Sequence, residues 1–241
     1  MSASQTAVSS PRLKNPPSAS QRRLALLTGG AGLVAFALAW IEGPNNLQGA
    51  SGATVRRYFE GNFSTLQRDV WAETLVFAAV LIFVLGISSL MRQAEAPKGL
   101  YRDLTVLSGG LVAAAYWLQG SVDAVPLVLA DDAGKLSSYS DQALVALEVL
   151  ARVSETSGDL ATVPRALLVL AVSLLALRTG FVPRWTAVIG LAVVALSLVG
   201  VLGSWPIPAL GGALVIALFG FYLWLLLVSA ALVLRGLRRV S

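Results

Sequence analysis

The chain has 241 residues, of which 56% are hydrophobic and 13% charged, and its mean hydropathy is +0.74. Soluble domains carry about 25% charged residues, so this composition predicts an integral membrane protein. The sequence contains no cysteine and no histidine, which excludes disulfides, cysteine-held iron–sulfur clusters, histidine-ligated metals and a Ser–His–Asp triad within the chain. The net charge of +5 comes mainly from basic residues at the ends of apolar runs. That placement indicates orientation in a membrane, and we expect no nucleic-acid partner.

Residues 1–21 are polar and rich in Ser, Pro and Ala, which predicts a disordered cytoplasmic tail. The remainder, residues 22–241, forms the predicted membrane domain. It contains six apolar runs of about the length that a bilayer-spanning helix needs. We expect transmembrane helices at residues 24–41, 71–91, 104–130, 160–177, 185–203 and 209–234. The predicted fold class is therefore all-α, a polytopic membrane helix bundle with six transmembrane helices.

The first apolar run has an alternative interpretation as a cleaved signal peptide, because Ala37-Leu38-Ala39 resembles a cleavage site. The apolar core of a signal peptide is usually only 7–15 residues long. The greater length of this run favours a transmembrane helix.

The positive-inside rule orients the six helices. With the N-terminus in the cytoplasm, most of the 18 basic residues fall on the inner side, whereas Glu95 and Asp103 are the only acidic residues there. The inner basic residues are Arg12, Lys14, Arg22, Arg23, Arg92, Lys98, Arg102, Arg178, Arg184, Arg235, Arg238 and Arg239. We therefore predict that both termini are cytoplasmic and that the protein is a multi-pass protein of a bacterial plasma membrane.

Two outer connections have patterns of their own. In residues 140–157, apolar residues fall roughly on one helical face, which predicts either a short amphipathic helix on the outer surface or an extension of the fourth helix broken near Gly158 and Pro164. In residues 42–70, Ser51 or Thr54 can cap a short helix. We expect that helix to cover polar helix ends, and a lid over an outer pocket is the alternative.

The third predicted helix carries the most unusual polar residues. Tyr116, Gln119 and Asp123 are spaced so that they share one helical face. An intramembrane carboxylate needs a partner, water or a proton. One interpretation is an ion pair with Arg165, or with Arg68 as second choice, and the other is an outward-facing polar pocket. Glu73, near Arg68 at the start of the second predicted helix, is also a candidate, although we expect an ordinary interfacial carboxylate there.

Three stretches carry a resemblance to a known family. They are Gly43-Pro44 with Ser51-Gly52-Ala53-Thr54-Val55 and Tyr58-Phe59, the turn Leu177-Arg178-Thr179-Gly180-Phe181-Val182-Pro183-Arg184-Trp185 with Ile189-Gly190-Leu191, and Leu223-Trp224-Leu225-Leu226-Leu227-Val228-Ser229 with Leu234-Arg235. The chain resembles a family of small, uncharacterised actinobacterial membrane proteins with six helices, of the domain-of-unknown-function type. The resemblance implies six helices and a plasma-membrane location, and it implies no activity.

The sequence contains no phosphate-binding loop, dinucleotide fingerprint or metal motif, so we expect no cofactor and no metal site. The leading hypothesis is a non-enzymatic accessory, scaffold or stabilising subunit of a plasma-membrane assembly. Its partners would be membrane lipids and other membrane subunits or further copies of the chain. The alternative hypothesis is binding or transport of a lipid or small amphiphile in an outward-facing pocket between the second, third and fourth predicted helices.

Overall fold

The computed structural model describes residues 18–39, 47, 49–95, 99–204 and 212–237, and in these residues every regular element is an α-helix. The helices are α1 (Ala19–Leu38), α2 (Gly52–Gly61), α3 (Phe63–Ala94), α4 (Leu100–Asp123), α5 (Val125–Leu129), α6 (Asp141–Leu160), α7 (Thr162–Thr179), α8 (Arg184–Ser204) and α9 (Gly212–Leu237). Most of the predicted tail, residues 1–17, lies outside the described residues, as do the connection at 205–208 and the predicted inner residues Arg12, Lys14, Lys98, Arg238 and Arg239.

Five helical runs are long and apolar enough to cross a membrane. They are Phe63–Ala94, Leu100–Leu129, Asp141–Thr179, Arg184–Leu202 and Gly212–Leu237. This confirms the predicted all-α, multi-pass membrane class. The third predicted helix is present as α4 and α5, which are separated at Ala124 two residues before Pro126. The break agrees with the restriction that a proline imposes on the helical backbone before it.

Helix α1 begins at Ala19, five residues earlier than predicted, because the chain before the apolar run supplies a helix start. The Ser18 hydroxyl accepts a hydrogen bond from the Gln21 backbone N–H, and the Gln21 side chain accepts one from the Ser18 N–H. This reciprocal pair is a capping box. Residues 19–21, predicted to belong to the tail, are therefore helical.

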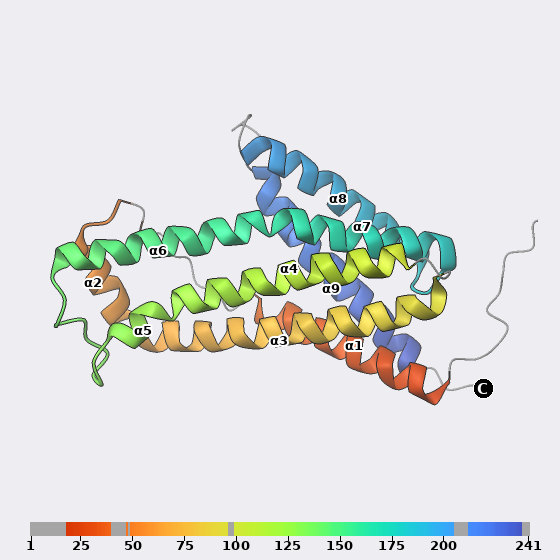
Figure 1. Cartoon of the computed structure of the whole chain (residues 1–241), viewed down its shortest axis with the longest axis horizontal. Helices are drawn as coiled ribbons and strands as arrows, with labels where there is room; N and C mark the ends of the chain where they lie inside the picture. The colour runs from red at the N-terminus through yellow and green to blue at the C-terminus, as the bar shows by residue number, and fades with distance from the viewer. Residues whose placement is uncertain (1–17, 40–46, 48, 96–98, 205–211, 238–241) are drawn as a thin grey trace, which may run out of the picture.

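Helices α3, α4, α6 and α7 run along the long axis of the molecule, and α1, α8 and α9 run obliquely to it (Figure 1). Helix α4 packs against α3 and α7, while α1 packs between α3 and α9, and α8 covers α7 and α9. The first turn of α1 meets the end of α9, where a Cβ at Gly236 would lie 3.0 Å from the Arg22 carbonyl oxygen. The two described ends of the chain are therefore at the same end of the bundle.

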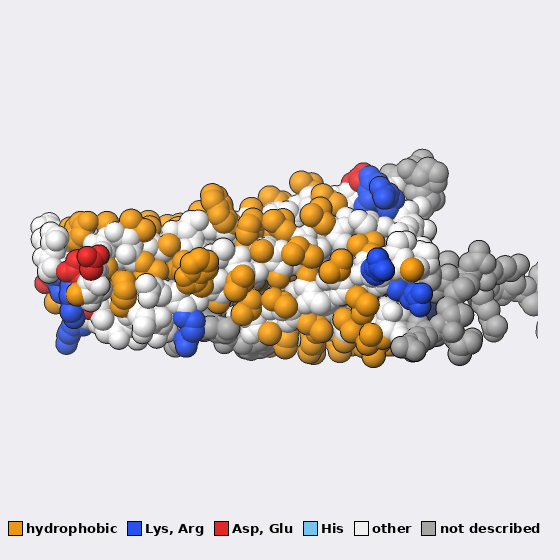
Figure 2. Space-filling view, turned by 90° about the horizontal axis from the view of Figure 1, so that it is seen from below, with side chains coloured by type: hydrophobic (Ala, Val, Ile, Leu, Met, Phe, Trp, Pro, Cys, Tyr) orange, Lys and Arg blue, Asp and Glu red, His pale blue; other side chains and the backbone are white. Residues whose placement is uncertain are grey.

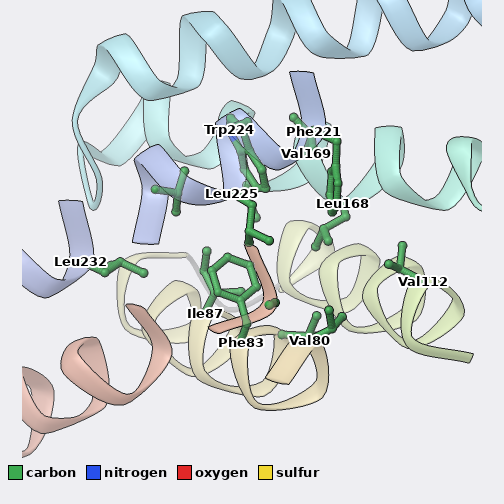
Figure 3. Close-up of a cluster of buried hydrophobic side chains, with 14 of the residues drawn as sticks. Val80, Phe83, Ile87, Val112, Leu168, Val169, Phe221, Trp224, Leu225 and Leu232 are labelled. Atoms are coloured by element: carbon green, nitrogen blue, oxygen red, sulfur yellow. The ribbon is translucent and has the colours of Figure 1, made fainter. Parts of the chain in front are cut away.

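The main core fills the middle of the bundle with large apolar side chains. Phe83 and Ile87 from α3 face Trp224 and Leu225 from α9, with Leu168 from α7 closing the group (Figure 3). Trp224 is fully buried and lies roughly parallel to Phe221, with ring centroids 6.4 Å apart. These contacts link α3, α7 and α9 through one continuous interior.

A second, smaller core lies at the end of the bundle away from the described chain ends. Its buried residues are Leu47, Val55, Phe59, Leu66, Leu136, Leu144 and Leu147. Helix α2 supplies Val55 and Phe59, and its N-cap is Ser51, whose hydroxyl accepts from the Thr54 N–H. The predicted short helix in residues 42–70 is thus confirmed. We call the unit formed by α2, α5, the N-terminal half of α6 and the chain between α5 and α6 the cap.

Helix α6 leads into α7 with Ala161 alone between them, so that Asp141–Thr179 forms one long helical run. Of the two predicted alternatives, the structure has the extension of the following helix, broken between Gly158 and Pro164. Pro164 has no N–H to donate, which leaves the helical hydrogen-bond ladder incomplete at this point.

The charged side chains visible in Figure 2 gather toward the two ends of the molecule, with hydrophobic side chains over most of the face between them.

Candidate functional site

Arg165 of α7 lies in the interior of the bundle, near the predicted residue Tyr116. Its side chain is 7% exposed, and the guanidinium carbon lies 5.5 Å from the Tyr116 ring centroid and 5.8 Å from that of Phe221. The Nη1 group donates to the Gly158 carbonyl oxygen at 3.1 Å. Two aromatic faces and a backbone carbonyl thus offset part of the cost of burying a guanidinium.

Tyr116 connects this arginine to the far side of the bundle. Its side chain is 2% exposed, and its hydroxyl forms a short hydrogen bond with the Tyr222 hydroxyl of α9. The predicted helical face of Tyr116 therefore points inward. Tyr116 thus contacts α9 through Tyr222 and α7 through Arg165, inside an otherwise apolar core.

Asp123, about two turns further along α4 than Tyr116, meets α6. The Ser154 hydroxyl donates to Asp123 Oδ2 at 3.1 Å. Ser154 and Gly158 are one turn apart on α6, so Asp123 and Arg165 contact successive turns of the same helix. Gln119 lies between them, with Oε1 3.9 Å from the position of a Cβ at Gly158. The structure thus brings Tyr116, Gln119, Asp123 and Arg165 to one seam along α6 and α7.

Glu73 was expected at the start of a helix, and this expectation is wrong. Helix α3 begins at Phe63, which places Glu73 almost three turns inside it. The side chain is 3% exposed and lies against Gly120 of α4, where a Cβ would be 3.0 Å from Glu73 Oε2. Because glycine has no side chain, α4 approaches closely enough to enclose the carboxylate.

Arg68, the second predicted partner of Asp123, lies at the surface. Its side chain is 63% exposed, and its Nε is 3.5 Å from the carboxylate of the adjacent Asp69. An exposed pair of this kind contributes little to stability. The structure leaves Arg68 outside the seam.

A small space lies beside Asp123, at the level where an outward pocket was predicted. The space that Asp123 lines together with Phe59, Leu66 and Leu147 has a volume of ≈ 10 Å³. A cavity needs about 10–15 Å³ to hold one water molecule. This one space is too small for an amphiphile.

Arg56 organises the cap, and sequence reasoning missed it. Its guanidinium donates to the carbonyl oxygens of Leu136 and Tyr139, each at 2.6 Å, and pairs with Asp141 at 3.0 Å. Glu60, one turn along α2, accepts from the Leu136 N–H at 2.8 Å. The spacing of Arg56 and Glu60 on one helical face was a readable signal, but the backbone acceptors come from a segment about 80 residues further along the chain.

Tyr58 of α2 links the cap electrostatically to the seam. Burial raises the pKa of its phenol above the ordinary value of 10.0, and the negative charges of Asp69 and Asp123 raise it further. Because the folded protein holds the phenol in its neutral form, deprotonation favours the unfolded cap. Stability is retained below pH 10 and falls as the pH rises toward the folded pKa.

We therefore expect the Tyr58 phenolate to appear with a midpoint above 10.0. The measurement is an ultraviolet absorbance titration of the folded protein, taken as the difference between wild type and Tyr58→Phe. In Asp69→Asn the midpoint should move down toward the ordinary value. A midpoint at or below 10.0 in wild type would show that the cap is open to solvent at this position.

Among the described residues, no group of three or more acidic side chains is placed to hold a metal ion. Comparisons with known proteins return no match: none to a protein-family model, none to a curated protein and none to a solved structure. The candidate site is therefore defined by its own geometry, as a polar seam beneath a cap.

Proposed function

We propose that this protein is a non-enzymatic membrane subunit, an accessory, scaffold or stabilising component of a plasma-membrane assembly. The topology that we infer has six transmembrane helices with both termini in the cytoplasm. Helix α1 is the sixth, since it packs between α3 and α9 and begins beside Arg22 and Arg23. The basic residues Arg92, Arg178 and Arg235 belong to the same end, which supports this orientation.

The observation that carries the proposal is a row of exposed valines on α6. Val145, Val149 and Val153 follow one another at four-residue spacing and are 40–54% exposed. Counted from the inner end of α7, about 20 residues cross the hydrocarbon core, which places its outer limit near Leu160. The valine row then lies roughly 10 to 22 Å beyond that limit, at 1.5 Å per residue. An apolar row outside the hydrocarbon core is typical of a surface that a partner covers.

The chemistry of this surface favours another apolar helix as its partner. The row continues into the exposed residues Leu160, which ends α6, and Val163 and Leu167 of α7. A helix that crosses the membrane alongside α7 and extends outward would therefore meet one continuous apolar face. We propose that this helix belongs to another subunit of the assembly.

Transport receives less support from the geometry. The main core is filled by Trp224, Phe83 and other large side chains, and the space beside Asp123 is ≈ 10 Å³. A transporter for an amphiphile would need a binding volume of several hundred Å³ near this level. The filled interior is what a supporting subunit requires.

Replacement of a valine in the row is expected to release the partner. Burial of a valine side chain stabilises an interface by roughly 1.5 kcal/mol or more, so Val149→Gln should weaken the assembly about tenfold. The measurement is native mass spectrometry of the protein extracted gently from the membrane in which it is made. Wild type should carry a second subunit at fixed stoichiometry, and Val149→Gln should be found mainly alone.

Val128→Gln is the matched control, because Val128 is 81% exposed on α5 and lies outside the row. It should leave the assembly intact. A symmetric oligomer of this chain that Val149→Gln dissociates would reassign the partner helix to a second copy. A monomer in wild type and both variants would refute the subunit proposal.

A further inference from the structure

A groove opens at the end of the bundle that carries the described chain ends, on the opposite side from the cap. It lies between α9 and the turn that joins α7 to α8, and its volume is ≈ 540 Å³. On the α9 side it is lined by Leu227, Ala230, Ala231 and Leu234, whose spacing places them on one helical face. Two alanines between two leucines leave the hollow along the helix.

The opposite wall is the turn from Gly180 to Trp185. Gly180 ends α7 in the left-handed conformation, with φ of 66° and ψ of 22°, which glycine adopts without strain. Phe181 and Val182 are then buried, while Trp185 stands 52% exposed at the rim of the groove. An exposed tryptophan at this level is typical of the membrane–water interface.

The positively charged side chain of Arg235 lies at one end of the groove. Arg235 lines it and donates a hydrogen bond from Nη1 to the Phe181 carbonyl oxygen, which fixes the guanidinium against the turn. A guanidinium has five N–H donors in a planar fork that suits phosphate oxygens. Arg184, at the start of α8, is exposed beside the same turn.

The acidic side chains described at this end of the bundle are engaged elsewhere. Glu95 accepts from the backbone N–H groups of Tyr101 and Arg102, and Asp103 pairs with the Arg102 side chain at 2.6 Å. Among the described residues, neither of these carboxylates therefore neutralises the positive charge at the mouth of the groove.

We propose that this groove binds one anionic phospholipid of the cytoplasmic leaflet. An acyl chain lies along Leu227, Ala231 and Leu234, and the phosphate meets Arg235. Basic residues that close an apolar crevice between transmembrane helices on the cytoplasmic side suit such headgroups. The site is separate from the valine row of α6, at the other end of the molecule, so it does not depend on the proposed subunit function.

The test is a titration of the purified full-length chain with phosphatidylglycerol and, separately, with phosphatidylcholine, followed by native mass spectrometry. Wild type should bind one phosphatidylglycerol in preference to phosphatidylcholine. Arg235→Gln should weaken the binding of phosphatidylglycerol about fivefold, the contribution of one basic residue near a headgroup. Ala231→Trp, which fills the groove and keeps every charge, should abolish it.

Arg92→Gln is the control, since it removes an equal charge at the same end from a position that does not line the groove. It should leave the affinity unchanged. Equal losses in Arg92→Gln and Arg235→Gln would show non-specific attraction to an anionic surface and overturn the proposal. Unchanged binding in Ala231→Trp with a wild-type circular dichroism spectrum, or equal affinity for the two lipids, would also overturn it. So would a polypeptide that remains bound in the groove and crosslinks to position 231 in place of lipid.

Discussion

Gly52→Ala is expected to open the cap. A Cβ at this position would lie 1.8 Å from the Asp141 carbonyl oxygen, 2.4 Å from its carbonyl carbon and 2.7 Å from its Cα. All three atoms belong to the backbone at the start of α6, so no side-chain rotation can relieve the contact. Overpacking costs up to about 3 kcal/mol, and this rigid contact belongs at the upper end of that range. Because Arg56 also reaches Asp141, the displacement should loosen the charged contacts of the cap as well.

The measurement is amide hydrogen exchange of the cap in lipid nanodiscs, where a change of about 3 kcal/mol in local opening corresponds to roughly hundredfold faster exchange. The matched control is Gly61→Ala, at the other end of α2, where a Cβ meets nothing within 4 Å. It should exchange as wild type does. Equal protection in Gly52→Ala and Gly61→Ala would mean that α2 does not rest on α6 in the membrane.

Trp224→Ala should produce the largest loss of global stability. The side chain is fully buried where α9 packs against α7 and α8, and a Cβ at Gly190 of α8 would lie 2.7 Å from its Nε1 atom. Figure 3 shows it above Leu225 in the centre of the core. Removal of a buried tryptophan leaves a cavity that costs about 3–5 kcal/mol. Helices α8 and α9 should separate most readily, because the ring fills the space between them.

Thermal unfolding in detergent, followed by circular dichroism, measures this loss. Trp117→Ala is the control for loss of an indole, since Trp117 is 61% exposed on α4 and faces outward from the bundle. Its melting temperature should stay close to that of wild type. A similar decrease in both variants would indicate that Trp117 also packs against protein, and it would make the exposed face of α4 an interface.

The apolar runs were sufficient to predict the five long apolar helices, but the helix ends depend on residues outside the runs. Ser18 and Gln21 form the capping box that starts α1, and that pattern was present in the sequence before the first apolar residue. Helix α3 extends outward to Phe63 through a polar stretch that has no bilayer signal. Its outer turns are held instead by burial of Leu66 in the cap core, a tertiary contact that hydropathy does not report.

The arrangement of the candidate site residues could likewise be predicted only in part from the sequence. Helical spacing correctly placed Tyr116, Gln119 and Asp123 along one seam of α4. Their partners come from α6, α7 and α9, and a single sequence does not say which of several polar residues faces a given helix. The enclosure of Glu73 depended on Gly120, a residue with no polar group to attract notice. The Asp123–Arg165 ion pair and an outward-facing pocket remain the two predictions for the chemistry of this seam.

The α6–α7 run is interrupted only at Ala161, so α6 and α7 form two rigid segments joined at that residue. Helix α6 is 20 residues long, roughly 30 Å, and α7 is anchored in the main core. The Arg165 guanidinium donates a hydrogen bond across the interruption to the Gly158 carbonyl oxygen. A side chain of α7 therefore holds the last turn of α6 in place. A tilt of about 10° at this pivot would carry the far end of α6 through roughly 5 Å. Such a tilt would change the contact between Gly158 and Arg165, whose guanidinium lies over the aromatic rings of Tyr116 and Phe221.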